Sequence, residues 1–205
     1  MKILIACEES QTVCAAFRER GHEAYSCDVL PCSGGRPEWH LLGDVTKYLS
    51  RGWDMIIAHP PCTYLTVTGN KYFDTGKYGA AAWKRMRERN KAIAFFYRFV
   101  LVDCERVAIE NPVGVMSTAY RPPTQTIQPY EFGDPYEKRT CLWLKGLPPL
   151  KPTNIVIPEK RKVFASGKSM PAWYADAFAL PPEERARVRS KTFPGIARAM
   201  AEQWG

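Results

Sequence analysis

The ten residues Trp53-Asp-Met-Ile-Ile-Ala-His-Pro-Pro-Cys62 decide the fold class of this chain. Residues 53–58 form a short, almost wholly apolar run rather than an alternating one, which is typical of a strand buried on both faces of a sheet. The prolines at 60 and 61 cannot continue a strand ladder because they have no backbone N–H to donate. The sequence therefore predicts a central strand that ends at His59 and places Cys62 on a rigid turn.

Segments of the same kind lie on both sides of this strand. The other predicted strands are Met1–Ala6, Glu23–Cys27, Arg106–Glu110 and Thr140–Leu144, with a further strand end near Gly43-Asp44-Val45. Between them we expect a helix that Ser10 caps, a long helix over 79–103 and a last helix over 194–204. Strands that alternate with helices predict an α/β fold with a parallel, Rossmann-like sheet, in which ligands bind at the carboxyl ends of the strands.

The long helix predicted over 79–103 has two contrasting faces. Apolar residues recur at three-, four- or seven-residue steps, so we expect them to face the core. They are Trp83, Met86, Ile93, Phe96 and Val100. The other face carries Lys84, Arg85, Arg87, Arg89 and Lys91. Such a run of charges is most often a solvated helix face, and contact with phosphate is the alternative.

Length and composition restrict the class of protein. The chain has 205 residues, a formal charge of +8, 45% hydrophobic and 24% charged residues, which excludes a disordered chain and a coiled coil. We expect one domain in the cytoplasm, because the longest apolar runs are far shorter than the ~20 residues of a membrane span. The seven cysteines form no C-x-x-C pair, so we expect reduced thiols and no metal site. The positive charge favours a polyanionic partner.

Polar side chains follow several predicted strands, so one crevice can gather them. Cys62 is the candidate nucleophile, because a thiol on an exposed, rigid turn can be aimed at a substrate. Glu110, beside Asn111, ends a strand, and a carboxyl group held in a pocket can have a raised pKa and act as an acid. A thiolate facing a carboxylic acid suits addition to an electron-poor ring whose nitrogen the acid protonates. The alternative for Cys62 is a small residue in a tight turn.

Acidic residues stand at the ends of three other predicted strands. Asp28 and Asp44 have the placement of groups that hold a ribose or an adenine amino group in nucleoside-binding α/β folds. Glu8 also falls just past a strand. The alternative for each is an ordinary acidic turn residue.

The motifs at these strand ends occur in a fixed order. They are Cys27-Asp28, Gly43-Asp44-Val45, His59-Pro-Pro-Cys62, Ile109-Glu-Asn-Pro112, Phe132-Gly-Asp-Pro-Tyr-Glu-Lys-Arg139 and Lys191-Thr-Phe-Pro-Gly-Ile-Ala197. This series resembles that of the cytosine C5-methyltransferases, especially the short versions encoded by phages and prophages. The match spans residues 1–140 and resumes at 190. Pro-Pro-Cys alone is a weak signal, whereas its combination with Glu-Asn and Phe-Gly-x-Pro is fairly specific.

The resemblance implies a class I methyltransferase that transfers a methyl group from S-adenosylmethionine to C5 of cytosine. It implies that Cys62 adds to C6, that Glu110 acts at N3 beside Asn111, and that Arg139 or Lys138 contacts O2 or a nearby phosphate. The cytosine must then leave a duplex, or belong to a single strand or a free nucleotide. The implied cofactor-binding residues are Glu8, Ser10, Gln11, Asp28 (ribose), Val29, Asp44 (adenine), Val45 and Pro60 (methionine side).

Two motifs depart from the family pattern. The loop Ala6-Cys-Glu-Glu-Ser-Gln-Thr12 has no glycine where the family has a glycine-rich loop, so the approach of the cofactor to the backbone must differ. The family's Gln-x-Arg-x-Arg motif is replaced by Tyr136-Glu-Lys-Arg-Thr140, which keeps Lys138 in register. We favour Arg139, because its planar fork suits a carbonyl or a phosphate.

The segment between the two matching regions is short. We expect a catalytic core of residues 1–140 and 190–205 and a reduced recognition region at 141–189, too small for extensive reading of bases. Basic residues at 161, 162 and 168 and the pair Trp173-Tyr174 suit phosphates and a stacked base. The alternative, which we favour for the aromatic residues, is a small core of Trp173, Phe178 and Leu180.

Four functions are open on the sequence alone. C5-methylation of cytosine in DNA leads, and the same chemistry on a free cytidine nucleotide or on RNA is second. The third is an amino-methyltransferase, because His59-Pro-Pro-Cys62 also resembles the Asp/Asn-Pro-Pro-aromatic motifs that bind an exocyclic amine. The fourth is a non-catalytic relative that binds nucleic acid or the cofactor.

Overall fold

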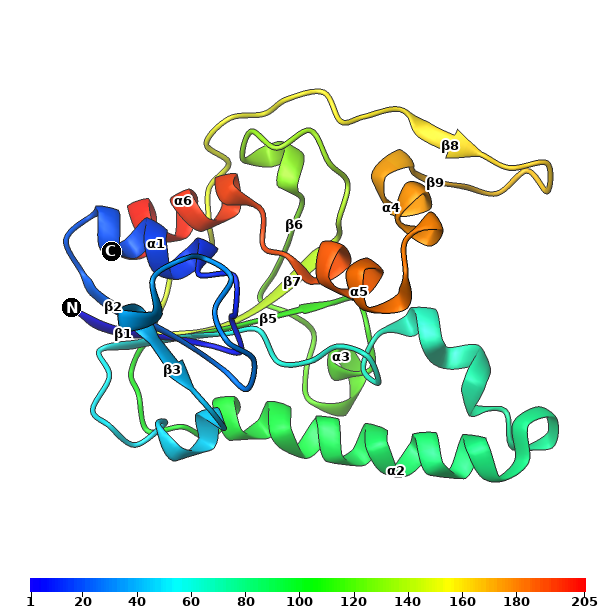
Figure 1. Ribbon diagram of the computed structural model, residues 1–205, viewed down its shortest axis with the longest axis horizontal. Coiled ribbons are helices and arrows are strands. Elements are labelled where there is room, and N and C mark those ends of the chain that lie inside the picture. Colours follow the sequence, from blue (N-terminus) through cyan, green and yellow to red (C-terminus); the bar gives the residue numbers. More distant parts are fainter.

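A seven-stranded sheet forms the centre of the computed structural model, which describes residues 1–205 (Figure 1). Its strands are β1 (Lys2–Ala6), β2 (Glu23–Asp28), β3 (His40–Leu42), β4 (Met55–Ala58), β5 (Val107–Pro112), β6 (Gln125–Ile127) and β7 (Thr140–Lys145). They lie in the order β3-β2-β1-β4-β5-β7-β6. The pairs among β1 to β5 are parallel, and β7 is antiparallel to both of its neighbours. The predicted α/β fold with a Rossmann-like sheet is confirmed.

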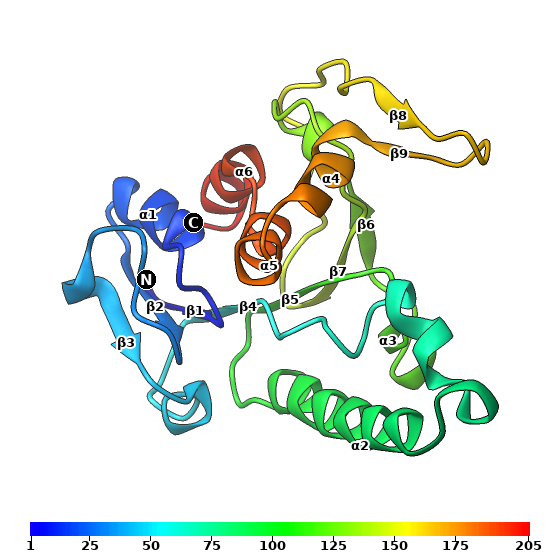
Figure 2. The ribbon, with the colours of Figure 1, turned by 45° about the vertical axis from the view of Figure 1, so that its right-hand side comes forward.

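Helices cover both faces of this sheet (Figure 2). Helices α1 (Thr12–Glu19) and α6 (Pro194–Trp204) lie on one face, and α2 (Thr75–Val100) and α3 (Met116–Ala119) lie on the other. Successive strand residues point to opposite faces, so Ile3 and Ile5 pack toward α1 and α6 whereas Leu4 and Ala6 pack toward α2. All four are fully buried. Burying an aliphatic side chain of this size stabilises the fold by about 1.5–3 kcal/mol.

Helix α6 closes the core on the α1 side. Ile196, Met200 and Trp204 recur at four-residue steps, and all three are buried in one apolar cluster with α1 and the sheet. The start of the helix is fixed by the Gly195 N–H, which donates to a carboxylate oxygen of Asp134 at 2.7 Å. The helix predicted over 194–204 is confirmed, and two motifs separated by about fifty residues in the sequence are joined at its first turn.

The predicted cap of the first helix is wrong. Helix α1 begins at Thr12, and the side chain of Ser10 is not its cap. Instead the Glu8 carboxylate accepts from the N–H groups of Val13 (2.6 Å) and Cys14 (3.1 Å). A carboxylate suits this place because it faces the positive end of the helix dipole and accepts two of the first unpaired N–H groups.

Helix α2 differs in part from its prediction. It begins at Thr75, and its backbone is kinked at Gly79. Trp83, predicted on the buried face, is 58% exposed, whereas Phe96 and Phe99 are buried. The reason is that the first half of the helix extends beyond the sheet, where Ala82 is its only buried residue (Figure 1).

The region 141–189 contains both core and surface structure. Strand β7 lies between β5 and β6, so the core continues past residue 140. The rest forms a projecting hairpin, β8 (Arg161–Val163) and β9 (Ser169–Pro171), and two helices, α4 (Ala172–Asp176) and α5 (Pro182–Ser190) (Figure 2). None of the helices in the chain combines the length and apolar character that crossing a bilayer requires.

The small core expected in this region forms only in part. Trp173 packs on Tyr136 and Phe193, with ring centroids 6.2 and 5.9 Å apart. Phe178 is 52% exposed, so it does not belong to a buried cluster. Trp173 thus fastens α4 to the segments on either side of the region.

Candidate active site

The strand register aligns four polar side chains along the carboxyl edge of the sheet. Ala6 of β1 pairs with Cys27 of β2 and with Ala58 of β4, and Ala58 pairs with Ile109 of β5. The next residue of each strand therefore lies in the same row. This sheet-edge row consists of Asp28, Cys7, His59 and Glu110. It crosses the point between β1 and β4 where the strand order reverses, the usual ligand site of α/β folds.

His59 and Glu110 form the central contact of the sheet-edge row. His59 Nδ1 lies 3.3 Å from Glu110 Oε2, and the two side chains are only 10% and 15% exposed. The other ring nitrogen, Nε2, is buried without a hydrogen-bond partner. A carboxylate this far from water needs a partner, and the histidine supplies it. No pattern in the sequence marks His59 as a site residue, because only the register of β4 against β5 shows the pair.

Asn111 holds the turn that carries Cys62. Its side chain is 1% exposed, and Nδ2 donates to the carbonyl oxygen of Pro60 at 2.7 Å. Removing the amide would leave that carbonyl without its partner, at a cost of about 1–3 kcal/mol. Asn111 therefore orients the Pro-Pro-Cys turn.

The charges of Cys62 and Glu110 are coupled. Burial raises the pKa of the half-buried Cys62 thiol, and the negative charge of Glu110 raises it further. Burial also raises the pKa of Glu110, but the hydrogen bond from His59 and the charge of Lys138 more than offset this, and the net pKa lies below its ordinary value. The predicted raised pKa of Glu110 is therefore wrong for the ligand-free protein. The resting site holds a protonated thiol beside a carboxylate.

Lys138, rather than Arg139, is the basic residue that faces this pair. Its positive charge acts on both Cys62 and Glu110, against the burial that raises both pKa values. Its Nζ also donates to the carbonyl oxygen of Lys191 at 3.0 Å, which joins two of the motifs. Arg139 is exposed, and it is not among the charges that act on the pair. Neighbouring residues of an extended segment point in opposite directions, so only one of the two can face the site.

Arg189 is a second cation of the site, and it was not among the residues predicted to form the site. It lies in the last turn of α5, and its charge counters the burial that raises the pKa of Cys62. The guanidinium carbon sits 3.7 Å from the centre of the Tyr174 ring, which fixes its position. No pattern around Arg189 marks it, because α5 is a short polar helix and its contact with the turn is purely tertiary.

Two arginines of α2 hold the segment that follows Cys62. Arg85 Nη2 donates to the carbonyl oxygen of Thr63 at 3.2 Å, and Arg89 Nε donates to that of Tyr64 at 2.8 Å. Arg89 Nη2 also donates to Asn70 Oδ1 at 2.7 Å. These two side chains were expected to face solvent or a phosphate. They instead order the loop between Cys62 and α2.

Replacing Arg89 with alanine is expected to loosen this loop. The change removes two hydrogen bonds and the contact with Phe73, whose ring centre lies 3.5 Å from the guanidinium carbon. We expect limited proteolysis within residues 63–73 to become at least about tenfold faster, since each lost bond to a charged group is worth about 1.5–3 kcal/mol. Arg87→Ala, an exposed position on the same helix, is the matched control. Equal cleavage rates in the two variants would contradict the assigned role of Arg89.

The first loop adopts left-handed backbone conformations without glycine. Cys7 and Gln11 have φ angles of 60° and 59°, in a region that costs a residue with a side chain about 1–3 kcal/mol. The Gln11 amide offsets this cost, because Nε2 donates to the Arg36 carbonyl oxygen (2.7 Å) and Oε1 accepts from the Arg36 N–H (3.0 Å). The loop therefore makes the sharp turns of a glycine-rich loop with other residues.

Asp28 and Asp44 both lie near this loop. After burial, the charges of both aspartates contribute to raising the pKa of the Cys7 thiol, so both lie near the end of β1. Asp28 Oδ1 accepts from the N–H of Leu30 at 2.9 Å. Asp44 Oδ1 accepts from the N–H (2.9 Å) and the hydroxyl (2.8 Å) of Thr46, and these bonds lower the pKa of Asp44. Each carboxylate is thus oriented by its own turn.

The other residues of the predicted cofactor set divide into two groups. Three of them have structural roles in the fold: Glu8 caps α1, Gln11 binds Arg36, and Val45 is buried in the core. Pro60 is also buried. Ser10 is half-buried and Val29 is 71% exposed, so these two keep surface open beside the aspartates.

Replacing His59 with glutamine is expected to raise the pKa of Glu110, because burial would then act without the charge of the histidine. The lowered pKa of wild-type Glu110 stabilises the folded protein above the ordinary glutamate pKa, and this contribution is lost as the pH falls through the folded value. The stability difference between wild type and His59→Gln is therefore largest near neutral pH and shrinks in acid. Carboxyl-carbon NMR titration and thermal melts from pH 3 to pH 8 measure both effects. His40→Gln is the control, and equal Glu110 titrations in the two variants would refute the pairing.

Comparison with known proteins assigns this chain to no family. No protein-family model and no curated protein matches the chain. Among solved structures, the chain is similar to a candidate DNA modification methyltransferase encoded within a prophage of E. coli, with a TM-score of 0.47 and 13% sequence identity. The similarity covers 89% of this chain but only 56% of that one.

Proposed function

We propose that this protein methylates cytosine at C5, in DNA, with S-adenosylmethionine as the methyl donor. The observation that carries the proposal is the sheet-edge row. Glu110 carries a carboxyl group, and Cys62 carries a thiol on the turn after β4. The carboxylates of Asp28 and Asp44 lie at the ends of β2 and β3 of the same sheet. Three of the motifs that resemble the C5-methyltransferases, which contain Asp28, His59 and Glu110, contribute residues to this row.

The side chains at the ends of β2 and β3 can bind the proposed cofactor. The carboxylates of Asp28 and Asp44 can accept hydrogen bonds from ribose hydroxyls and from an adenine amino group. The left-handed turns at Cys7 and Gln11 shape the loop beneath them, and Val29 offers apolar surface at the rim. When bound, S-adenosylmethionine supplies an electrophilic methyl group.

The resting protonation states suit the proposed addition to cytosine. The proton on the Cys62 thiol moves to the Glu110 carboxylate, which leaves the total charge of the pair unchanged. The thiolate sulfur then bonds to C6 while Glu110 gives the proton to N3, which makes C5 nucleophilic. After C5 has taken the methyl group, its own proton leaves to solvent. The C6–S bond breaks, and N3 returns its proton to Glu110.

The surrounding cations support these steps. Lys138 and Arg189 lie where they stabilise the thiolate, which burial alone would disfavour. His59 holds the carboxyl group of Glu110 in place while it gains and loses the proton. Asn111 fixes the turn, so the sulfur keeps its position relative to the carboxyl group.

We further propose that the surface part of 141–189 is a reduced recognition region. The hairpin β8–β9 and helices α4 and α5 carry this proposal, since β7 belongs to the sheet. Arg161 pairs with Glu137, and Lys162 pairs with Asp176 at 3.2 Å, so these two charges are already partly neutralised. The small remaining surface favours loose sequence specificity.

The test is methyl transfer from labelled S-adenosylmethionine to duplex DNA, single-stranded DNA, RNA and dCMP, assayed in parallel. The expected product is 5-methylcytosine in a DNA substrate. Label at N4 would instead establish the amino-methyltransferase, and label in dCMP or RNA alone would establish the second alternative. Isothermal titration measures binding of S-adenosylmethionine. No binding at millimolar concentration would exclude every hypothesis in which the protein is a methyltransferase.

A further inference from the structure

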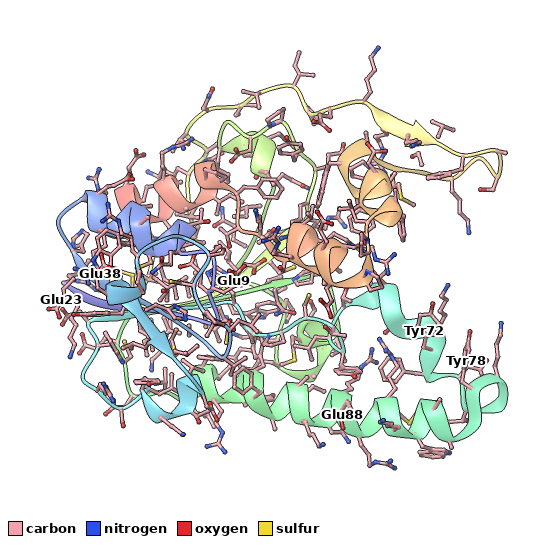
Figure 3. The ribbon with its side chains drawn as sticks, in the orientation of Figure 1. Glu9, Glu23, Glu38, Tyr72, Tyr78 and Glu88 are labelled. Atoms are coloured by element: carbon pink, nitrogen blue, oxygen red, sulfur yellow. The ribbon has the colours of Figure 1, made fainter.

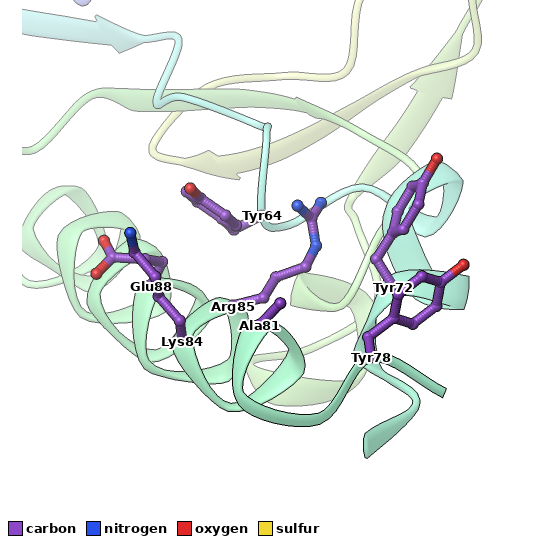
Figure 4. Close-up of a pocket in the computed structure, with 7 residues that line it drawn as sticks. All are labelled: Tyr64, Tyr72, Tyr78, Ala81, Lys84, Arg85 and Glu88. Atoms are coloured by element: carbon purple, nitrogen blue, oxygen red, sulfur yellow. The ribbon is translucent and has the colours of Figure 1, made fainter. Parts of the chain in front are cut away.

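A concave site lies beside the loop that follows Cys62 (Figure 4). It is a cavity of about 320 Å³ between α2 and the 3₁₀ segment Val67–Phe73. Its lining residues are Tyr64, Tyr72, Tyr78, Ala81, Lys84, Arg85 and Glu88. We call it the tyrosine pocket. Its volume is at the lower end of the range for small-molecule sites, so it fits one nucleotide rather than a duplex.

Two tyrosines form the outer wall of the tyrosine pocket. The ring centroids of Tyr72 and Tyr78 are 5.5 Å apart, and Tyr72 is 43% exposed. Both rings stand at the outer end of α2, away from the core (Figure 3). Lys71 and Lys77 lie over these rings at 5.0 and 5.6 Å. Exposed aromatic faces flanked by cations are the usual platform on which proteins stack nucleic-acid bases.

The floor of the tyrosine pocket is positively charged. Arg85 points into it between Tyr64 and Tyr72, and its guanidinium carbon lies 5.0 and 5.5 Å from the two ring centres. Arg85 Nε is buried and has no hydrogen-bond partner. Lys84 adds a second cation, while Glu88, the one acidic lining residue, is paired with Lys91 at 2.9 Å. The net charge suits a phosphate group.

We propose that the tyrosine pocket binds a nucleotide that flanks the target cytosine in a single-stranded segment of the substrate. The base would rest on Tyr72 and Tyr78, and Lys84 and Arg85 would face its phosphate. This inference rests on the proposed function and deepens it.

The position of the pocket argues for a polynucleotide rather than a free nucleotide. Tyr64 of the pocket lies only two residues after Cys62, so the two sites share one loop. They are nevertheless separate, because neither Cys62 nor Glu110 lines the pocket. One molecule can occupy both sites only if it has at least two nucleotides. A free nucleotide bound at Cys62 would leave the tyrosine pocket empty.

Binding of fluorescently labelled 12-residue oligonucleotides, followed by anisotropy in the Cys62→Ser protein without cofactor, tests the inference. The probes are single-stranded DNA, single-stranded RNA and duplex DNA of one cytosine-containing sequence. The variants are Tyr72→Ala/Tyr78→Ala and Lys84→Ala. The matched controls are Trp83→Ala and Arg87→Ala, which change an exposed aromatic residue and an exposed cation on the opposite side of α2.

We expect the double tyrosine variant to bind single strands about 5- to 100-fold more weakly, as is typical for the loss of base stacking, while both controls bind as the parent does. Lys84→Ala should reduce the slope of log K against log salt by about 0.7, the value for one phosphate contact to a single strand. The DNA and RNA probes show which strand the pocket prefers. Should the double variant fail to fold by circular dichroism, Lys84→Glu takes its place.

The outcomes separate this inference from the proposed function. Unchanged binding of single strands in the tyrosine and lysine variants, or an equal loss of binding in the controls, overturns the proposed role of the tyrosine pocket even if the protein methylates cytosine. Loss of binding confined to the pocket variants supports it even if no methyl group is transferred. Methylation of dCMP by the protein with its cysteine intact, with no measurable binding of any strand, overturns it as well.

Discussion

Cys62→Ala protein is expected to bind S-adenosylmethionine normally and to lose methyl transfer by at least about 10⁴-fold, as is usual when a catalytic nucleophile is removed. The proposed cofactor contacts Asp28 and Asp44 lie at the ends of β2 and β3, whereas Cys62 follows β4, so the change removes the proposed reacting sulfur and leaves these carboxylates intact. Transfer of label to cytosine and titration with the cofactor measure the two properties separately.

The control for this variant is Cys32→Ala, since Cys32 is another free, partly exposed cysteine outside the sheet-edge row. A second readout uses DNA that contains 5-fluorocytosine. The C5–F bond blocks the step that loses the C5 proton, so the wild-type protein should remain covalently attached through Cys62. Retained methylation in Cys62→Ala, or an adduct on another cysteine, would show that the nucleophile lies elsewhere.

Glu110→Gln is expected to lower methyl transfer by roughly 10²–10⁴-fold, the usual effect of removing a general acid. Glutamine keeps the shape and can still bond His59, but it has no proton to give to N3. The variant should also lose the part of the acid sensitivity of wild-type stability that comes from the lowered pKa of Glu110. Activity on DNA and melting temperatures from pH 3 to pH 8 measure the two effects.

The matched variant is Glu105→Gln, an exposed glutamate that precedes the same strand. It should leave both activity and the pH dependence of stability unchanged. Activity in Glu110→Gln within a factor of about ten of wild type would mean that protonation at N3 does not come from this side chain, since a general acid contributes roughly 10²-fold or more.

Much of the sheet could be predicted because its strands are buried on both faces. Such strands appear as apolar runs, and prolines and polar residues mark where they end, as at His59 after β4. The end predicted for β5 at Glu110 is wrong, because pairing with β7 continues the strand to Pro112. The spacing of apolar residues also located helix α6. Three apolar positions four residues apart predicted a helix with the bounds that the structure shows. Helix α2 was harder, because half of it extends past the sheet and Trp83 meets no core.

The active-site chemistry was only partly visible in the sequence. Cys62 follows β4 and Glu110 lies near the end of β5, so both could be located. The direction in which the pKa of Glu110 shifts depends on His59 and Lys138, which the strand register and a distant segment bring to it. Arg189 comes from a polar helix with no distinguishing pattern. The left-handed turns at Cys7 and Gln11 were equally hidden, since neither residue type signals that conformation.

The docking of helix α6 has a consequence for synthesis of the protein. Ile196, Met200 and Trp204 complete the apolar cluster on the α1 face, and they are synthesised long after the β1 residues that they pack with. Until they emerge from the ribosome, the cluster that contains Ile3, Ile5 and Phe17 lacks the cover that α6 supplies. A chain that stops before residue 194 would keep this surface exposed and would aggregate or be degraded rather than persist as a smaller enzyme. A frameshift that alters residues 194–204 should therefore be as damaging as one that alters the strands of the sheet.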